Sequence, residues 1–218
     1  MLSLPIAARG GARFRILCIG AHCDDIEIGC GGTMLKLLEC VPQSEVYWVV
    51  LSADSVRARE ATDSAQAFLD GATAKTIVIK EFRNSFFPFI GATLKEYFET
   101  LKATVAPDVI FTHRREDLHQ DHQLVSQLTW NTFRNHMILE YEIPKYDGDL
   151  GSPSVFTHLS EHVCHRKVAA LMAHFKSQLD KPWFDEQTFW ALLRLRGMES
   201  NSPSKYAEAF YCRKVVLG

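Results

Sequence analysis

The chain has no apolar run long enough to cross a membrane and no cluster of basic residues. A spanning helix needs about 20 predominantly apolar residues, so we expect no membrane span. The formal net charge is -2, and without a basic run the sequence offers no electrostatic footprint for nucleic acid. It also lacks an internal repeat and a low-complexity linker, which leaves no reason to divide residues 1–218 into two domains.

The six cysteines contain no Cys-x-x-Cys pair. In a chain of this size they are typical of reduced thiols in a reducing compartment. Residues 1–9 are too short and too interrupted for the apolar core of a signal peptide. We therefore expect a cytoplasmic protein, with residues 1–12 as a loosely ordered N-terminal segment.

Strand and helix patterns alternate along the chain, which is long enough for one large domain at 218 residues and 47% hydrophobic content. Short, almost continuously apolar segments predict strands, and longer amphipathic segments predict helices. The expected strands are 14–19, 46–51, 76–79, 108–112, 155–159 and 210–215, and the expected helices are 31–39, 55–69, 93–105, 120–139, 160–178 and 186–196. This order predicts a single α/β domain: a Rossmann-like, doubly wound, mostly parallel sheet with helices on both faces.

Two clusters of His and Asp follow predicted strands. Residues 22–25 read His-Cys-Asp-Asp after the first strand, and residues 119–122 read His-Gln-Asp-His after the fourth. Ligands of open α/β sheets bind beyond the carboxyl ends of the strands, and strands one and four are neighbours in the usual winding order. Together the clusters offer two imidazoles and a carboxylate for a divalent metal, with further acids and a further His for proton transfer.

Each cluster alone has an ordinary structural interpretation. Asp24 and Asp25 could cap a helix, because acids favour helix N-termini. Residues 119–122 could be a solvated helix start, and residues 113–115 (His-Arg-Arg) either reach the same pocket or form a basic loop. The glycines of residues 29–32 do not match the GxGxxG spacing, and the neighbouring carboxylates would repel a pyrophosphate. Only the co-occurrence of both clusters at one sheet edge favours a metal site.

Five segments in this order resemble one known family. Residues 21–33 closely resemble the signature loop of the PIG-L/LmbE-like zinc de-N-acetylases, and residues 119–122 resemble that family's His-x-Asp-His motif. Residues 57–61 resemble its Arg-x-x-Glu segment, and residues 174–178 and 206–210 resemble its C-terminal landmarks. The resemblance covers nearly the whole chain.

The resemblance implies one Zn²⁺ per chain, although another divalent metal such as Fe²⁺ would suit the same ligands. The implied ligands are His22, Asp25 and His122, with water in the open position. Asp24 would then be the general base, and Asp121 would orient a neighbouring histidine.

Two further residues receive roles from the same resemblance. His119 would be the polar partner of the tetrahedral intermediate and a candidate acid for the leaving amine. Arg57 would contact the substrate or the developing oxyanion. One departure is Cys23, where the family usually has proline: a thiol there could be a harmless small residue, an inhibitory fourth ligand or a redox-sensitive group.

The implied activity is hydrolysis of an N-acyl group, acetyl above all, from an amino sugar or its conjugate. The polar segment 141–153 is the candidate substrate-selecting loop, with Tyr141 and Lys145 as candidate contacts. Two alternatives stay open: a metal-dependent phosphoesterase, and a non-catalytic sugar-binding module on the same scaffold. The expected partner is a small amino-sugar substrate, and a homo-oligomer is compatible with the family resemblance.

Overall fold

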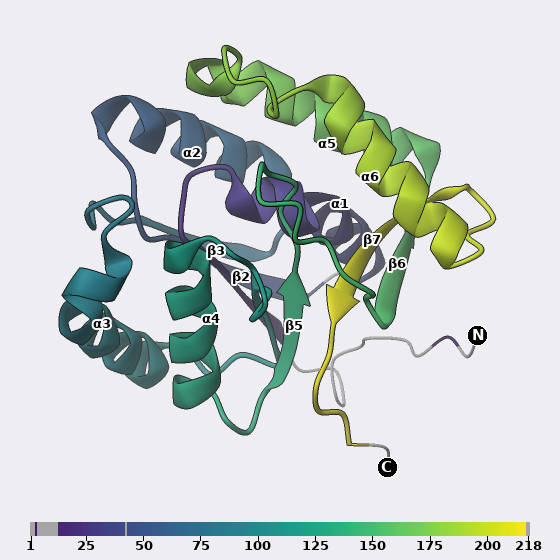
Figure 1. Ribbon diagram of the computed structural model, residues 1–218. Helices are drawn as coiled ribbons and strands as arrows, with labels where there is room; N and C mark the ends of the chain where they lie inside the picture. The colour runs from purple at the N-terminus through teal and green to yellow at the C-terminus, as the bar shows by residue number, and fades with distance from the viewer. Residues whose placement is uncertain (1–2, 4–12, 42, 217–218) are drawn as a thin grey trace.

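The computed structural model describes Ser3, residues 13–41 and residues 43–216 (Figure 1). The expectation for residues 1–12 thus falls almost wholly outside the described residues. The strands are β1 (Phe14–Gly20), β2 (Ser44–Val50), β3 (Ala74–Ile79), β4 (Val109–His113), β5 (Met137–Tyr141), β6 (Val155–Leu159) and β7 (Tyr206–Tyr211). The α-helices are α1 (Asp25–Cys40), α2 (Ser55–Phe68), α3 (Gly91–Thr104), α4 (Gln120–Thr132), α5 (Glu161–His174) and α6 (Glu186–Glu199), with short 3₁₀ helices η2 (Phe87–Ile90) and η3 (Lys176–Gln178).

The seven described strands form one sheet in the order β3-β2-β1-β4-β5-β7-β6. Neighbours from β3 to β5 run parallel, whereas β7 is antiparallel to both β5 and β6. The chain winds outward from β1 in one direction through β2 and β3, then returns to the other side of β1 at β4. The winding therefore reverses between β1 and β4, which is where a doubly wound sheet opens a crevice for ligands.

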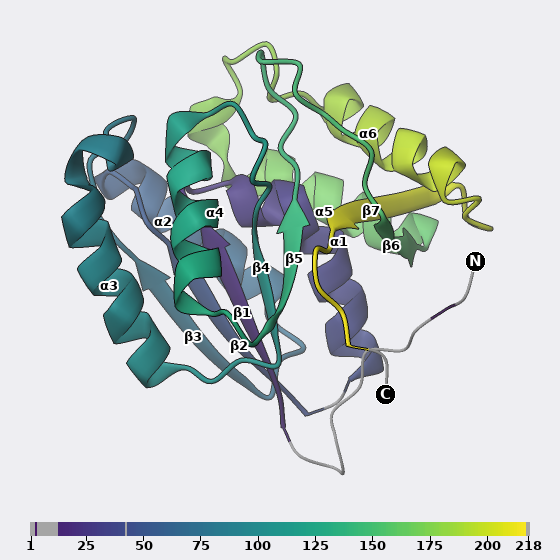
Figure 2. The same ribbon diagram turned by 60° about the horizontal axis from the view of Figure 1, so that its bottom comes forward.

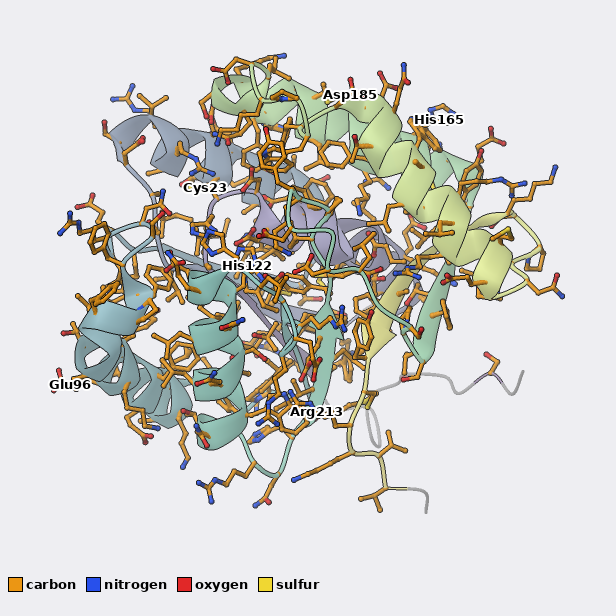
Figure 3. All side chains as sticks on the ribbon, in the orientation of Figure 1. Cys23, Glu96, His122, His165, Asp185 and Arg213 are labelled. Carbon is orange, nitrogen blue, oxygen red and sulfur yellow. The ribbon has the colours of Figure 1, made fainter. Side chains whose placement is uncertain are left out.

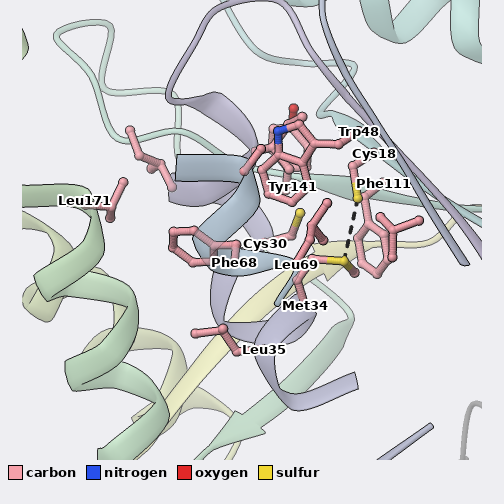
Figure 4. Close-up of a cluster of buried hydrophobic side chains, with 14 of the residues drawn as sticks. Cys18, Cys30, Met34, Leu35, Trp48, Phe68, Leu69, Phe111, Tyr141 and Leu171 are labelled. Carbon is pink, nitrogen blue, oxygen red and sulfur yellow. Dashed lines mark hydrogen bonds between the residues drawn. The ribbon is translucent and has the colours of Figure 1, made fainter. Parts of the chain in front are cut away.

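Helices cover both faces of the sheet (Figures 1 and 2). Alternate residues of β1 enter different cores: Ile16 and Cys18 face the cluster beneath α1, α2, α5 and α6, whereas Leu17 faces the cluster beneath α3 and α4. Figure 4 shows the first cluster, in which Trp48 stacks on Phe68 with ring centroids 6.4 Å apart. The predicted mostly parallel α/β architecture is thus confirmed. No helix of the described residues is long and apolar enough to cross a membrane.

Four elements differ from the sequence expectation by four residues or more at a boundary. Helix α1 begins at Asp25 instead of residue 31, and the last strand spans 206–211 instead of 210–215. Helix α5 ends at His174, and η3 follows it within the expected helix 160–178. The expected helix 120–139 ends at Thr132, and the apolar residues after it form β5, because Met137 pairs with Val109 of β4.

The glycines of α1 allow close packing of the helix. A Cβ atom on Gly29 would lie 2.2 Å from Tyr141 Cδ2, and one on Gly32 would lie 2.5 Å from Leu159 Cδ1. Real Cβ atoms do not approach so closely, so both positions need glycine for packing on β5 and β6. This agrees with the rejection of a phosphate-binding loop.

Candidate metal centre

The loop after β1 is held by its own hydrogen bonds. The backbone N–H of His22 donates to Asp25 Oδ2 at 2.6 Å, and the N–H of Ala21 donates to His113 Nε2 at 2.9 Å. Asp24 occupies the N-cap position of α1, but its side chain makes no capping hydrogen bond. Helix capping therefore does not explain Asp24.

The three expected ligands meet in one place. His22 Nδ1 lies 3.1 Å from His122 Nε2 and 3.4 Å from Asp25 Oδ2, and His122 Nε2 lies 3.5 Å from Asp25 Oδ1. In a tetrahedral site with metal–ligand bonds of about 2.0–2.1 Å, neighbouring ligand atoms are about 3.3 Å apart. The donor atoms of the three side chains therefore have spacings close to those of a zinc site. Figure 3 labels His122 at the N-terminal end of α4.

Both histidines are oriented by carboxylates behind them. His22 Nε2 lies 3.3 Å from Asp121 Oδ2, and His122 Nδ1 lies 3.0 Å from Asp117 Oδ2. Such partners fix the tautomer and ring orientation of metal-binding histidines. Asp121 thus lies where the sequence placed it. Asp117 was not anticipated, although an acid just before the His-x-Asp-His motif was a visible signal.

Asp121 is in turn fixed by the loop after β3. Its two oxygens accept the backbone N–H groups of Ser85 at 2.7 Å and Phe87 at 3.1 Å. Ser85 has φ of 64°, a left-handed conformation that is uncommon outside glycine. Strain of this kind gathers at functional sites, and here it directs an N–H toward the carboxylate that orients His22.

The electrostatics of the cluster favour a cation. Burial acts to raise the pKa of Asp25, but His122, His113 and His22 outweigh it and hold that pKa well below its usual range. Burial would likewise lower the pKa of His22, but the carboxylates of Asp25 and Asp121 raise it to about 9. An ionised Asp25 with acids behind it therefore attracts positive charge, as a proton or as a metal ion.

Asp24 stands beside the ligands with one free oxygen. Its Oδ1 lies 3.3 Å from Arg57 Nη2, while its Oδ2 has no hydrogen-bond partner among the described residues. Burial raises the pKa of Asp24, and the Arg57 guanidinium opposes that rise. Both side chains line a cavity of about 220 Å³ that also contains the three candidate ligands. A buried carboxylate oxygen with no partner is well placed to accept a proton there.

His119 also lines this cavity. Its Nδ1 accepts the backbone N–H of Asp121 at 3.2 Å, so a neutral ring carries its proton on Nε2. Burial, together with His22, lowers the pKa of His119 and favours that neutral form. The ring stacks on His122 with centroids 4.5 Å apart. His119 can therefore donate a hydrogen bond through Nε2.

His113 lies next to two of the candidate ligands, Asp25 and His122. It is the buried last residue of β4, its Nε2 lies 3.2 Å from Asp25 Oδ2, and its ring stacks on His122 with centroids 3.9 Å apart. Among the described residues, two sets of side chains have ligand atoms within 4.8 Å of one another: His22, His119 and His122, and Asp25, His113 and His122. Because His113 Nε2 already accepts the Ala21 N–H, we assign His113 to support of the loop after β1 and not to the metal.

Tyr141 requires a correction. It is fully buried in β5, and its hydroxyl donates to the Ile19 carbonyl at 2.7 Å. Tyr141 does not line the cavity, so it packs in the core and does not make the expected contact with substrate. Lys145 does line the cavity, but its Nζ is 3.0 Å from Asp117 and 2.5 Å from Asp149.

Cys23 points away from the ligands. Its Sγ donates to the Ser52 carbonyl at 3.3 Å, and the side chain is buried in the hydrophobic cluster that includes Ala61 and Ala65 of α2. Burial raises the pKa of this thiol. It therefore acts as a small core residue, not as a fourth ligand.

The family assignment follows from a match over the same elements. Residues 17–133 match the PIG-L family model, described as GlcNAc-PI de-N-acetylase, and this segment contains all three candidate ligands and Asp24. The chain belongs to the PIG-L family. A similar protein is the uncharacterized deacetylase YaiS of Escherichia coli K12, 27% identical over 186 residues that cover 80% of this chain and 97% of YaiS.

Solved structures share the fold of this PIG-L family member. The N,N'-diacetylchitobiose deacetylase of Pyrococcus horikoshii superposes with a TM-score of 0.67 at 20% identity, covering 91% of this chain and 83% of that one. GalB, the 4-carboxy-2-hydroxymuconate hydratase of Pseudomonas putida KT2440, superposes with a TM-score of 0.65 at 16% identity, covering 94% and 99%. Since a deacetylase and a hydratase share this fold, the reaction has to be argued from the site.

Proposed function

We propose that this protein is a zinc-dependent hydrolase that removes an N-acetyl group from an amino sugar or an amino-sugar conjugate. One observation carries the proposal. His22 Nδ1, His122 Nε2 and the Asp25 carboxylate lie 3.1 to 3.5 Å apart, close to tetrahedral spacing, and Asp24, whose Oδ2 has no hydrogen-bond partner among the described residues, lines the same cavity. Membership of a deacetylase family supports the choice of an N-acetyl group over other acyl groups.

The ligands and their supports prepare the site before substrate arrives. Asp117 and Asp121 hold the two imidazoles in orientation, and His113 accepts the N–H of Ala21 in the loop that leads to Asp25. A divalent metal bound there would supply Lewis acidity, acidifying a water molecule and polarising the amide carbonyl. All other steps belong to side chains of the protein.

Proton transfer is assigned to Asp24. It removes a proton from the attacking water through Oδ2 and returns that proton to the leaving nitrogen, which departs as the free amine with acetate as the second product. Arg57 holds Oδ1 and leaves Oδ2 available. A neutral His119, with its proton on Nε2, is a hydrogen-bond donor for the oxyanion and a poor acid, so we favour Asp24 for both transfers.

The site favours this reaction over phosphoester hydrolysis. Phosphoesterases with such ligands commonly use two metals and basic clamps. Here the two ligand-like sets found among the described residues both contain His122, so they describe one position. Arg57 and Lys145 are paired with carboxylates at that position.

The test combines metal content with acetate release. We expect about one zinc per chain in the wild type, because the three ligands match a single tetrahedral site, and loss of that zinc in His22→Ala and His122→Ala. Asp24→Asn should keep the metal and lose about 10²–10⁴-fold in kcat on N-acetylglucosamine conjugates. Asp63→Asn, on an exposed carboxylate of α2, is the matched control and should change neither quantity.

Two results would overturn the proposal. Wild-type protein that stays metal-free after zinc is added would remove the metal site. Full activity of Asp24→Asn would remove the base, and phosphate release without acetate release would favour the phosphoesterase. Sugar binding without any turnover in the zinc-loaded protein would favour a binding module.

A further inference from the structure

The connection between α5 and α6 forms part of the cavity wall. This connection, here called the 176–183 segment, contributes Gln178, Lys181 and Trp183 to the cavity that holds the metal ligands. It begins with η3, which packs on α2 (Figure 1). The 176–183 segment therefore lines the same cavity as His22, although the two are about 150 positions apart along the chain.

Lys181 is the unpaired cation of this wall. The other two lining cations have acidic partners: Arg57 lies 3.3 Å from Asp24, and Lys145 lies 3.0 Å from Asp117. No carboxylate among the described residues forms an ion pair with Lys181, whose Nζ donates instead to the neutral Gln178 Oε1 at 2.5 Å. Its charge is therefore available to a ligand.

The 176–183 segment is held in place from α2. Glu60 accepts the backbone N–H of Ser177 at 2.8 Å and the Ser177 hydroxyl at 2.5 Å. The Gln178 side chain donates to Ser177 Oγ at 2.9 Å and is 2% exposed. Lys181 is thus positioned by a buried amide that is itself tied to a carboxylate on α2. A cation held in this way loses less conformational freedom when it binds an anion.

Trp183 adds a flat apolar surface next to this cation. Lys181 Nζ lies 6.0 Å from the centroid of the indole ring, and Phe184 packs against that ring edge-to-face with centroids 5.6 Å apart. The indole is half-buried and lines the cavity. An aromatic face beside a hydrogen-bonding cation suits a ring with a charged substituent.

We propose that Lys181 and Trp183 form a subsite for an anionic group, a carboxylate or a phosphate, on the aglycone of the amino-sugar substrate. The inference rests on the proposed function, because it places the sugar between the metal ligands and the 176–183 segment. It narrows the substrate class from amino-sugar conjugates in general to those with a negative charge close to the sugar.

The first test compares turnover of three N-acetylglucosaminides: the neutral methyl glycoside, the carboxymethyl glycoside and the 1-phosphate. The wild type should have a higher kcat/KM for one or both anions than for the neutral compound. Lys181→Met should lower kcat/KM for the preferred anion by about tenfold, or about 1.4 kcal/mol, with the neutral compound changed less than about twofold. Lys181→Arg should retain part of the preference for anions. If Lys181→Met lowers kcat/KM for only one of the two anions, that anion identifies the group that Lys181 binds.

Lys176→Met is the matched control. Lys176 lies in the same segment, is exposed and donates to the Met172 carbonyl, but it does not line the cavity. This variant should keep the wild-type anion preference. A direct charge interaction also predicts that the preference shrinks from about 0.01 M to about 1 M salt, since the Debye length falls about tenfold. If Lys181→Met acts only by disturbing the structure, kcat/KM for all three substrates should fall together. The wild-type preference for anions should then not depend on salt.

A binding measurement separates the subsite from the activity. A calorimeter measures the affinity of the wild type and of Lys181→Met for the three corresponding free amines, and this measurement needs no turnover. Tighter binding of a charged amine that disappears in Lys181→Met supports the subsite, even if none of the acetylated compounds is hydrolysed. Equal binding of charged and neutral amines by the wild type, or no binding of any, overturns the subsite, even if the neutral substrate is deacetylated.

Discussion

The buried ion pair between Lys167 and Glu208 holds the helix that begins at the metal ligands. The two Glu208 oxygens accept the backbone N–H groups of Gly32 at 2.8 Å and Thr33 at 2.6 Å, in the middle of α1. Lys167 Nζ donates to Glu208 at 2.6 Å and to the Ile28 carbonyl at 2.6 Å. We predict that Glu208→Ala destabilises the protein far more than removal of an exposed acid.

The magnitude follows from burial. Lys167 and Glu208 are 3% and 4% exposed, so removing Glu208 leaves a buried ammonium with one carbonyl and no counterion. Breaking a buried pair in this way costs about 3–5 kcal/mol. That is a large part of the about 5–15 kcal/mol that typically stabilises a domain. Lys167→Met should cost less, because the two amide donors still stabilise the carboxylate.

Urea unfolding of the single and double variants measures this prediction, with equal m values as the condition for comparing them. Glu208→Gln replaces Glu208→Ala if the latter does not fold. Lys167→Met combined with Glu208→Gln should be more stable than the sum of the single effects predicts, by about 1.5–3 kcal/mol. The matched control is Glu39→Ala, which breaks an exposed pair of 2.9 Å between Glu39 and Arg166, also linking α1 to α5. It should cost less than about 1 kcal/mol.

Two outcomes would refute this reasoning. Glu208→Ala could be no more destabilising than Glu39→Ala, or the effects at 167 and 208 could be additive. Either would mean that the pair does not stabilise α1 through its charges. Because α1 starts at Asp25, a folded Glu208→Gln variant should also bind zinc more weakly than the wild type.

Two further predictions concern residues near the ligands. Asp117→Asn should weaken zinc affinity by about 10–100-fold in competition with a chelator, because it removes the acceptor behind His122. Asp63→Asn, on an exposed carboxylate of α2, should not change that affinity. Burial raises the pKa of Glu27 well above its usual value, so the folded protein keeps a proton that the unfolded chain loses above about pH 4.3. Stability of the wild type relative to Glu27→Gln should therefore fall as pH rises from that point, when the free energy of unfolding is measured in urea.

The absence of an effect would count against each idea. Equal zinc affinity in Asp117→Asn would mean that another contact orients His122. A Glu27→Gln difference that is constant between acidic and neutral pH would mean that Glu27 does not titrate as a buried acid.

The parallel part of the fold was predictable because its strands are continuous apolar runs. The strand at 137–141 was not, because Met137, Ile138 and Leu139 suit a helix as well as a strand. Only pairing with β4 decides between them, and pairing is a long-range property. Missing this strand also affected the interpretation of Tyr141. As part of a loop it was expected to contact the substrate, whereas β5 places it in the core.

The closeness of the two His/Asp clusters was predictable for a different reason. Each follows a strand, and parallel strands bring their carboxyl ends to one edge, so His22 and His122 could be placed together without contacts being known. The supports did not follow from that rule. Asp117 and His113 act through specific distances to His122 and Asp25, which depend on the path of the loop after β4.

Helix α2 explains why the Arg-x-x-Glu segment belongs to the site although neither residue is a candidate ligand. Arg57 and Glu60 are three positions apart, a spacing that puts both side chains on one side of a helix. Arg57 contacts Asp24, and Glu60 holds Ser177 in the segment that carries Lys181. One rigid element thus sets the position of the proposed base and of the opposite cavity wall. A substrate that contacts Lys181 while its amide meets Asp24 would therefore span a distance that α2 fixes in advance.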